Sequence, residues 1–235
     1  MYGNPCYVEE LEKIANRYNL VLIYDAAHAF NVKYRNVPIF NYGDVSIISF
    51  HATKVFHTIE GGALIFKNKS LLKKFQLIRN HGIVSEEQVI LPGTNAKMNE
   101  FEAIMGLCNL DIVNTQIKKR KYIYEYYKQN LSKKKFKFQK IIASKYNYSY
   151  MPVLLNNKKN RNKLYTLLIK NGIFPRKYFY PLTSDYDYIK NGTYKAKNLI
   201  LPVATDISNR ILCLPLYGEL KKTSIKNIIN LCNNL

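Results

Sequence analysis

One lysine stands in surroundings that differ from those of most other lysines in the chain. Lys54 follows the apolar stretch DVSIISF at residues 44–50 and precedes the glycine pair Gly61 and Gly62. Most of the 36 Lys and Arg residues lie instead in charged runs such as KKRK and SKKKFK, which water solvates. A partly desolvated amine is neutral more often, so it can attack an aldehyde carbon. The sequence therefore marks Lys54 as a candidate nucleophile.

An acidic residue ends a neighbouring apolar run. Asp25 closes the run at residues 20–26, and Ser49 closes the run at residues 43–50. Ligands of open α/β sheets bind at the carboxyl ends of the strands, so we expect Asp25 and Lys54 to lie together. Pyridoxal 5′-phosphate (PLP) needs an amine for its aldehyde, a carboxylate for its pyridine nitrogen and hydroxyl or backbone donors for its phosphate. These residue types suit a PLP site.

Each of these residues also has a simpler structural interpretation. Asp25 alone would more often cap a helix at DAAHAF, and only its pairing with Lys54 reverses that preference. His28 alone is more often a structural histidine, and a serine such as Ser49 is common at a strand end. Asn95, two residues after a glycine, fits an ordinary turn.

Four segments, in order along the chain, resemble the DegT/DnrJ/EryC1/StrS family of sugar aminotransferases, which are PLP-dependent enzymes of fold type I. The resemblance covers nearly the whole chain and leans towards enzymes that aminate a nucleotide-linked 4-keto-6-deoxyhexose of the dTDP type. The segments are YGNPCYVEELEKIANRYNLVLIYDAAHAF, DVSIISFHATKVFHTIEGGALIF, IRNHG and GTNAKMNEFEAIMGLCNL.

The resemblance implies a role for each candidate in the first half of the chain. Lys54 would bond the cofactor and move a proton during the reaction, and Asp25 would pair with the pyridine nitrogen. His28 takes the position of a family Gln or His beside the cofactor ring, and Ser49 would bind the cofactor phosphate. Asn95 matches a residue that reaches this phosphate from a neighbouring subunit, which implies a dimer.

Three further residues are candidates for substrate contact. Lys97 stands where the family often has arginine. Lysine keeps the positive charge but lacks the paired N–H donors with which arginine binds an anion at two points. Arg176 and Tyr178 lie in the segment FPRKYFYPL, although an aromatic run of this kind is more often part of a core. No cysteine or histidine spacing indicates a metal site.

The implied function is the transfer of an amino group, with glutamate as the expected donor, to a nucleotide-linked keto-deoxy sugar for surface glycans such as lipopolysaccharide O-antigen. The resemblance begins in the middle of the family pattern, so we expect an N-terminally truncated chain that acts as a homodimer or with a complementing N-terminal chain. The alternatives are an inactive or complementing fragment, and a basic protein that binds phosphate or nucleic acid. A related 3-dehydratase is disfavoured, because those enzymes carry histidine at the position of Lys54.

The periodicity predicts an α/β organisation followed by a smaller α+β unit. The resemblance implies an α/β fold of the aspartate aminotransferase type, with a large-domain sheet that is incomplete at its N-terminus and a small C-terminal α+β domain. We expect residues 1–118 to be the C-terminal part of the PLP-binding domain and residues 119–235 to be the small domain. The apolar strands indicate a sheet made to be buried on both faces, and strands left unpaired would expose apolar surface. Strands are expected at 20–26, 43–50, 62–68 and 148–155, and helices at 9–19, 70–80, 99–131 (with a break or bend near Asn114), 158–171 and 222–235.

The formal charge of +20 raises nucleic acid as a partner, but no recognition motif for nucleic acid is present. The lysines are spread over most of the chain and accompany many Asn, Ile and Tyr residues, a bias typical of an AT-rich coding sequence. The four cysteines show no paired spacing, and no apolar run approaches the length of a membrane span. We expect a cytoplasmic protein without a membrane partner.

Overall fold

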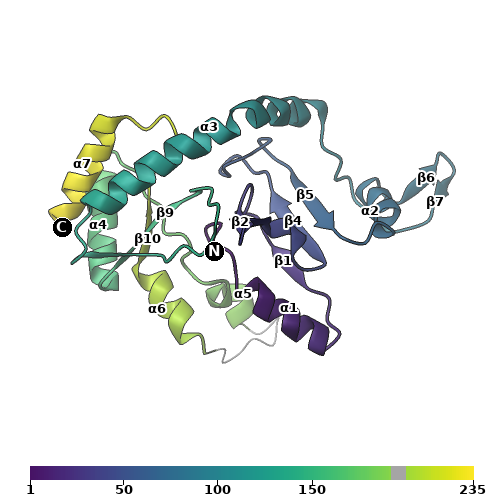
Figure 1. Cartoon of the computed structure of the whole chain (residues 1–235), viewed down its shortest axis with the longest axis horizontal. Coiled ribbons are helices and arrows are strands. Elements are labelled where there is room, and N and C mark those ends of the chain that lie inside the picture. The colour runs from purple at the N-terminus through teal and green to yellow at the C-terminus, as the bar shows by residue number, and fades with distance from the viewer. Residues whose placement is uncertain (192–199) are drawn as a thin grey trace. The chain divides into compact units, whose positions relative to one another are not determined.

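The computed structural model describes residues 1–191 and 200–235 (Figure 1). The chain divides into two compact units. The first unit consists of residues 1–117 and 141–147, and the second of residues 118–140 and 148–235. These units differ from the expected ranges 1–118 and 119–235 in two respects, because Lys118 lies in the second unit and residues 141–147 return to the first.

Side-chain and backbone hydrogen bonds hold residues 141–147 in the first unit. The backbone N–H of Lys33 donates to the carbonyl of Lys145 over 2.9 Å. The side chain of Asn147 donates to the carbonyls of His28 and Phe30, each over 2.8 Å. Hydrogen bonds between residues so far apart in the chain leave no periodic pattern in the sequence, which explains why the sequence did not reveal them.

The first unit contains a three-stranded sheet in the order β1–β4–β5. Strand β1 (Ile23–Asp25) pairs in parallel with β4 (Val45–Ser49), and β5 (Gly62–Phe66) pairs antiparallel with β4. The three predicted strands of this half are thus confirmed. Each is shorter than its apolar run, because the hydrogen-bonded pairing between strands ends before the hydrophobic pattern does.

Several apolar side chains of this sheet face solvent. Ile23 of β1 is 57% exposed, Ile47 of β4 is 45% exposed and Leu64 of β5 is 44% exposed. The small core of the unit is formed by Val8, Ala26, Ala29, Val32 and Ile39. The sequence pattern indicates a sheet that is buried on both faces. Within the described residues this sheet is not buried on both faces, and the expected exposure of its apolar strands is present.

Short elements surround the sheet of the first unit. Both helices predicted there are present, whereas two small hairpins were not predicted, because strands of two or three residues carry no measurable alternation. The remaining elements of this unit are α1 (Val8–Arg17), β2 (Lys33–Tyr34), β3 (Val37–Pro38), η1 (Ile39–Asn41), α2 (Leu71–Arg79), β6 (Ile83–Ser85) and β7 (Gln88–Val89).

Helix α3 (Glu100–Asn130) is divided between the two units, because the first unit includes its residues up to 117 and the second its residues from 118 onwards. It begins with a reciprocal cap: the side chain of Asn99 accepts the N–H of Glu102 over 2.9 Å, and the side chain of Glu102 accepts the N–H of Asn99 over 3.0 Å. This arrangement satisfies two backbone donors at the helix start. The helix runs without interruption through Asn114, so no break divides it there.

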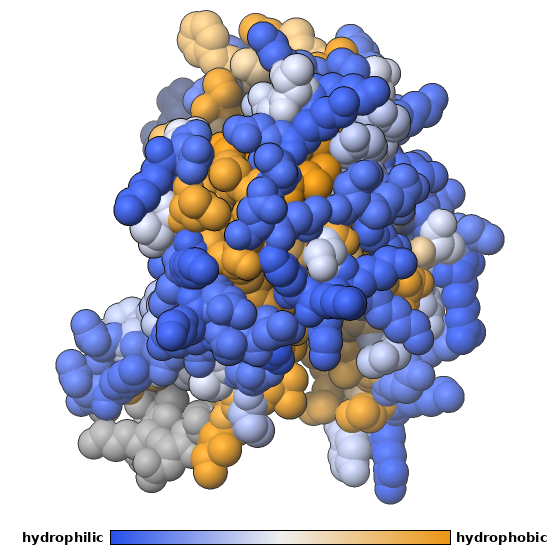
Figure 2. All heavy atoms as spheres, turned by 90° about the vertical axis from the view of Figure 1, so that its left-hand side faces the viewer, coloured by the Kyte–Doolittle hydropathy of each residue, from blue (hydrophilic) through white to orange (hydrophobic). Residues whose placement is uncertain are grey.

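The second unit is built on an antiparallel sheet in the order β10–β9–β8. Its strands are β8 (Phe136–Phe138), β9 (Met151–Leu155) and β10 (Ile211–Leu214). Of these, β9 and β10 are almost entirely buried. Hydrophilic side chains cover most of the face over α3, α4 and α7 (Figure 2). The helices of this unit are α4 (Lys158–Lys170), η2 (Thr183–Asp185), α5 (Asp187–Lys190), α6 (Pro202–Arg210) and α7 (Lys222–Asn233).

The sequence predicted α4 and α7 of the second unit but not α6 or β8. Asn157 caps α4, because its side chain accepts the N–H of Asn160 over 2.8 Å. The core of the unit includes Leu164, Leu212 and Ile228, all fully or almost fully buried. This core is larger than that of the first unit and contains apolar side chains from α3, α4, β9, β10 and α7.

Candidate active site

The parallel pairing of β1 and β4 places two polar residues at the same edge of the first unit's sheet. The register sets Asp25, the last residue of β1, beside Ile47 of β4. Ser49 ends β4 two residues later. Because parallel strands run in one direction, their carboxyl ends border the same space. The sequence-based expectation that this edge gathers polar side chains is consistent with the register.

The segment that follows β4 folds back and carries Lys54. The N–H of Lys54 donates to the carbonyl of His51 over 2.9 Å, which forms a tight turn. The loop closes where the N–H of Thr58 donates to the carbonyl of Phe50, and the N–H of Phe50 to the carbonyl of Gly61, each over 2.9 Å. These bonds fix the backbone on both sides of Lys54.

Lys54, Asp25 and His28 influence one another electrostatically. Partial burial lowers the pKa of Lys54 below its ordinary value, and the negative charge of Asp25 opposes this effect. Burial also lowers the pKa of His28 to about 4, with the charge of Lys54 acting in the same direction and that of Asp25 against it. His28 is therefore a neutral imidazole near neutral pH, and Lys54 is a half-buried amine beside a carboxylate.

Asp25 and Ser49 are both held by local backbone donors. The carboxylate of Asp25 accepts the N–H of Ala27 over 3.1 Å, and the hydroxyl oxygen of Ser49 accepts the N–H of His51 over 3.3 Å. As an acceptor in this bond, Ser49 keeps its own O–H proton available for donation. An amine, a carboxylate and a hydroxyl are groups that PLP requires, so Lys54, Asp25 and Ser49 fit that cofactor.

Phe50 and Phe56 form the apolar part of the loop that carries Lys54, and Phe30 from another segment packs against Phe56. The ring of buried Phe56 stacks on Phe30 with a centroid separation of 4.5 Å and meets Phe50 edge-on at 5.0 Å. Aromatic contacts of this kind stabilise a loop beyond the area they bury. None of these rings was predicted as part of the site, although Phe50 and Phe56 flank Lys54 in the sequence.

The glycine pair after Lys54 has a steric explanation. Gly61 adopts a φ of +140°, and a Cβ atom there would lie 2.5 Å from the hydroxyl oxygen of Thr58. A Cβ atom on Gly62 would lie 2.7 Å from the carbonyl oxygen of Ile48. Real side chains do not approach so closely, so both positions require glycine for the loop to close onto β4.

Asn95 and Lys97 lie in an exposed stretch between β7 and α3. Asn95 forms an isolated β-bridge with Asn80, and both Asn95 and Lys97 are exposed. Among the described residues, neither has a hydrogen bond or ion pair to Asp25 or Lys54. The described residues therefore show no polar contact of Asn95 or Lys97 with Asp25 or Lys54, and their predicted roles stay predictions.

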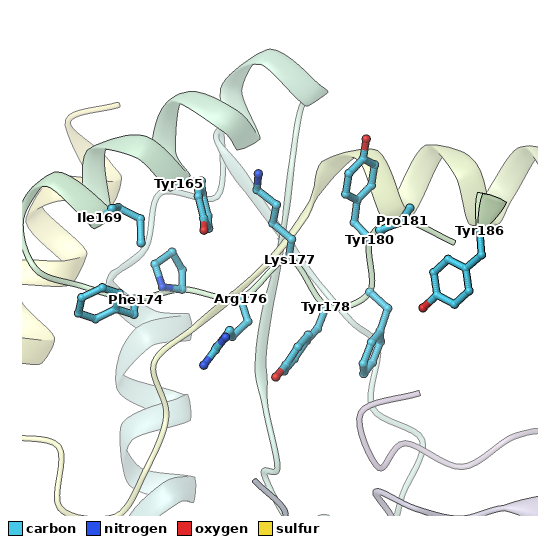
Figure 3. Close-up of a pocket in the computed structure, with 11 residues that line it drawn as sticks. Tyr165, Ile169, Phe174, Arg176, Lys177, Tyr178, Tyr180, Pro181 and Tyr186 are labelled. Carbon is cyan, nitrogen blue, oxygen red and sulfur yellow. The ribbon is translucent and has the colours of Figure 1, made fainter. Parts of the chain in front are cut away.

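Arg176 and Tyr178 belong to the second unit and line a pocket of about 420 Å³ there. The backbone of Arg176 pairs with Cys213 through two hydrogen bonds of 3.0 and 2.8 Å. Figure 3 shows the side chains of Arg176 and Tyr178 extending to the side opposite α4, whereas Lys177 and Tyr180 extend towards α4. The ring of Tyr178 meets that of Tyr150 edge-on at 5.7 Å.

The described residues contain no cluster of His, Cys, Asp and Glu side chains that would hold a metal ion. In the same part of the chain, no helix is long and apolar enough to cross a bilayer.

Comparisons with known proteins identify the family of the chain. Residues 1–233 match the DegT/DnrJ/EryC1/StrS aminotransferase family, so the chain belongs to that family. A relative from Shigella dysenteriae, named dTDP-4-amino-4,6-dideoxy-D-glucose transaminase, is 36% identical over 97% of this chain and 63% of its own length. The chain thus spans less than two thirds of this curated relative.

Two solved structures establish the fold. Helicobacter pylori PseC, an aminotransferase involved in the biosynthesis of pseudoaminic acid, has a TM-score of 0.89 at 24% identity, over 99% of this chain and 64% of PseC. Streptococcus pneumoniae Spr1654 in its PLP form has a TM-score of 0.86 at 23% identity, over 100% of this chain and 66% of Spr1654. The predicted α/β fold of PLP-dependent transferases is confirmed.

Proposed function

We propose that the chain acts as a PLP-dependent aminotransferase that transfers an amino group, with glutamate as donor, to a nucleotide-linked keto-deoxy sugar. The observation that carries this proposal is the electrostatic grouping of Lys54, Asp25 and His28 at the end of two parallel strands. A half-buried amine with a lowered pKa is the group that an aldehyde cofactor requires. Membership of the family supports the same assignment.

In this proposal each residue has one task. Lys54 would hold the cofactor through its amine, and the freed amine would hold and deliver the proton at the carbon that carries the amino group. Asp25 would keep the pyridine nitrogen protonated, His28 would offer a neutral imidazole to the ring, and Ser49 would donate its hydroxyl proton to the phosphate. When bound, the cofactor supplies the electron sink that the chain's own side chains lack.

The substrate is proposed from the relatives. The Shigella relative is named for a dTDP-linked amino-dideoxy sugar, which favours a dTDP-4-keto-6-deoxyhexose as the acceptor. The product would serve surface-glycan synthesis such as that of O-antigen. Lys97, Arg176 and Tyr178 are the proposed substrate contacts, since each offers a cation or a phenol to a phosphorylated sugar.

We further propose that the active form contains a second polypeptide. Asn95 lies exposed and away from hydrogen-bond contact with Lys54, which suits a residue that serves a neighbouring subunit's phosphate. The partner is either a second copy or a complementing N-terminal chain. A cytoplasmic location is supported by the four free cysteines, which are typical of reducing compartments.

Mixing the purified chain with PLP, reducing with borohydride and mapping the modified residue by mass spectrometry tests the proposal. We expect a visible absorption band and a modification at Lys54. Lys54→Ala should remove both, and Lys69→Ala, which removes an exposed lysine on the loop before α2, should leave both unchanged. Labelling scattered over surface lysines in the wild-type chain would contradict the proposal for this chain and favour an inactive or complementing fragment.

A further inference from the structure

Helix α3 passes close to the loop that carries Lys54. A Cβ atom on Gly106 of this helix would lie 2.9 Å from the Cγ2 atom of Thr58 in the loop. Gly106 is buried, and Thr58 is only 2% exposed. Glycine destabilises the interior of a helix relative to alanine, so its presence at 106 is explained by the space that the loop occupies. The helix and the loop are therefore in direct contact.

One side chain of α3 holds this loop by hydrogen bonding. The Nδ2 atom of Asn109 donates to the carbonyl oxygen of His57 over 2.8 Å and lies 3.4 Å from the Nδ1 atom of the same histidine. Asn109 follows Gly106 by three positions, so both face the same side of the helix. Asn109 and His57 are half-buried, which reduces competition from water for this hydrogen bond.

Other hydrogen bonds of the loop join residues that are close in the sequence. The N–H of Lys54 donates to the carbonyl of His51 over 2.9 Å, and the Nδ1 atom of His51 lies 2.8 Å from the hydroxyl oxygen of Thr53. Such local bonds set the shape of the turn but not its position within the unit. Asn109 is 52 residues from His57 in the chain. Its hydrogen bond therefore acts on the position of the loop.

Helix α3 also contacts the segment that follows β1. The side-chain nitrogen of Asn31 donates to the side-chain oxygen of Asn114 over 3.0 Å. The two segments also meet directly, since the ring of Phe30 stacks on that of Phe56. These contacts join the segments after β1 and β4 to each other and to one helix.

The position of the loop decides how far the amine of Lys54 is removed from water. Lys54 is half-buried, and this burial is the main cause of its lowered pKa, against the opposing charge of Asp25. If the loop moved outwards, water would solvate the amine and return its pKa towards the ordinary value of 10.5. A hydrogen bond from a helix to this loop opposes such a movement.

We propose that Asn109 is a positioning residue for Lys54 that acts through the carbonyl of His57, and that Gly106 leaves the space in which the loop packs on α3. The inference deepens the proposed function and rests on it, because Lys54 is the residue that is positioned. A carboxamide suits this task, since it donates a hydrogen bond without bringing a charge near the amine.

Competitive reductive methylation of the full chain without PLP, followed by mass spectrometry, tests the proposal. Its readouts are the ratio of the rates at Lys54 and exposed Lys69 at pH 7.5, and the apparent pKa of Lys54 from a pH series. Asn109→Ala should raise this pKa towards 10.5 and lower the ratio by about twofold or more. A purely structural role of Asn109 would leave both readouts unchanged in a folded chain.

Hydrogen–deuterium exchange of the same variant locates the effect. The amides of Lys54 and Thr58 should exchange about fivefold faster, because the loss of one hydrogen bond increases the open fraction of the loop by roughly this factor. Exchange in residues 141–147, which belong to the same unit, should change little. Equal acceleration in both segments, with an unchanged Lys54 to Lys69 ratio, would indicate general destabilisation and contradict the proposal.

Three further variants make the test specific. Gly106→Ala keeps Asn109 and favours the helix, but its Cβ atom displaces Thr58, so it should also lower the ratio. Asn109→Gln keeps the amide donor and should retain a ratio closer to that of the wild-type chain than Asn109→Ala does. Thr115→Ala, at an exposed position of the same helix, is the matched control and should leave the ratio unchanged.

Circular dichroism and thermal unfolding identify any variant that does not fold, and Gly106→Ala decides the test if Asn109→Ala is such a variant. Equal ratios in the wild-type chain and in a folded Asn109→Ala variant would overturn the proposal, as would an equal fall in Thr115→Ala. Failure of the wild-type chain to form a visible absorption band with PLP would instead count against the proposed function, because the methylation ratio is measured without the cofactor.

Discussion

Asp25 and Ser49 end two neighbouring parallel strands, with Asp25 beside Ile47 and therefore two residues short of Ser49 in the register. This offset sets a carboxylate and a hydroxyl along one sheet edge, and the turn at His51 brings the amine of Lys54 back to the same edge. The electrostatic effect of Asp25 on both Lys54 and His28 follows from this placement. Four predictions test this electrostatic arrangement and the packing that supports it.

Lys54 should react with aldehydes faster than exposed lysines do at the same pH. Its pKa is lowered by burial, so a larger fraction of its amine is neutral near pH 7.5. Competitive reductive methylation followed by mass spectrometry measures the rate at each lysine. Lys69, which is exposed, is the internal reference. An equal or slower rate at Lys54 would show that burial does not activate it.

Asp25→Asn should increase the reactivity of Lys54 further in the absence of PLP. The carboxylate raises the pKa of Lys54, so its removal lets the pKa fall and leaves more neutral amine. The same methylation assay measures this change. Asp44→Asn is the control, because the carboxylate of Asp44 accepts the N–H of Leu22 and has no effect on the pKa of Lys54. If Asp25→Asn slowed the reaction at Lys54, the two side chains would not interact as charges.

His28 should make stability depend on pH between 6.5 and about 4. Its pKa falls from 6.5 to about 4 on folding, so protonation favours the unfolded chain. The stabilisation is fully present above pH 6.5 and is lost as the pH falls towards 4, below which no further loss arises from this residue. Urea unfolding of the wild-type chain and of His28→Gln over this range isolates the effect. A constant difference in unfolding free energy between the two proteins from pH 7.5 to 4.5 would contradict it.

Asn147→Ala should destabilise the first unit by about 2–3 kcal/mol, because it removes two hydrogen bonds and leaves the carbonyls of His28 and Phe30 without this donor. The side chain is fully buried, so water cannot replace it without a local opening. Chemical unfolding measures the change, and Asn162→Ala, at an exposed position of α4, is the control. A loss below about 0.5 kcal/mol, the scale of ordinary surface substitutions, would show that Asn147 does not secure residues 141–147.

The local pattern of the chain was sufficient for much of the fold. Apolar runs ending in Asp25 and Ser49 predicted β1 and β4, and the Asn99–Glu102 spacing agrees with the start of α3. These features depend on residues close together in sequence, so periodicity and capping chemistry reveal them. Short elements such as β2 and β3 escaped prediction, because two-residue strands depend on their partners rather than on their own composition.

The sequence by itself determined the residue types of the candidate site: an amine in an apolar stretch, a carboxylate and a serine at strand ends, and glycines after the lysine. Only the tertiary structure decided which of them meet. It grouped Asp25, His28 and Lys54, returned residues 141–147 to the first unit and placed Asn109 of α3 against the loop that carries Lys54. The reason is physical, since strand pairing, burial and Coulomb interactions depend on distances in space, which the order of residues alone does not specify.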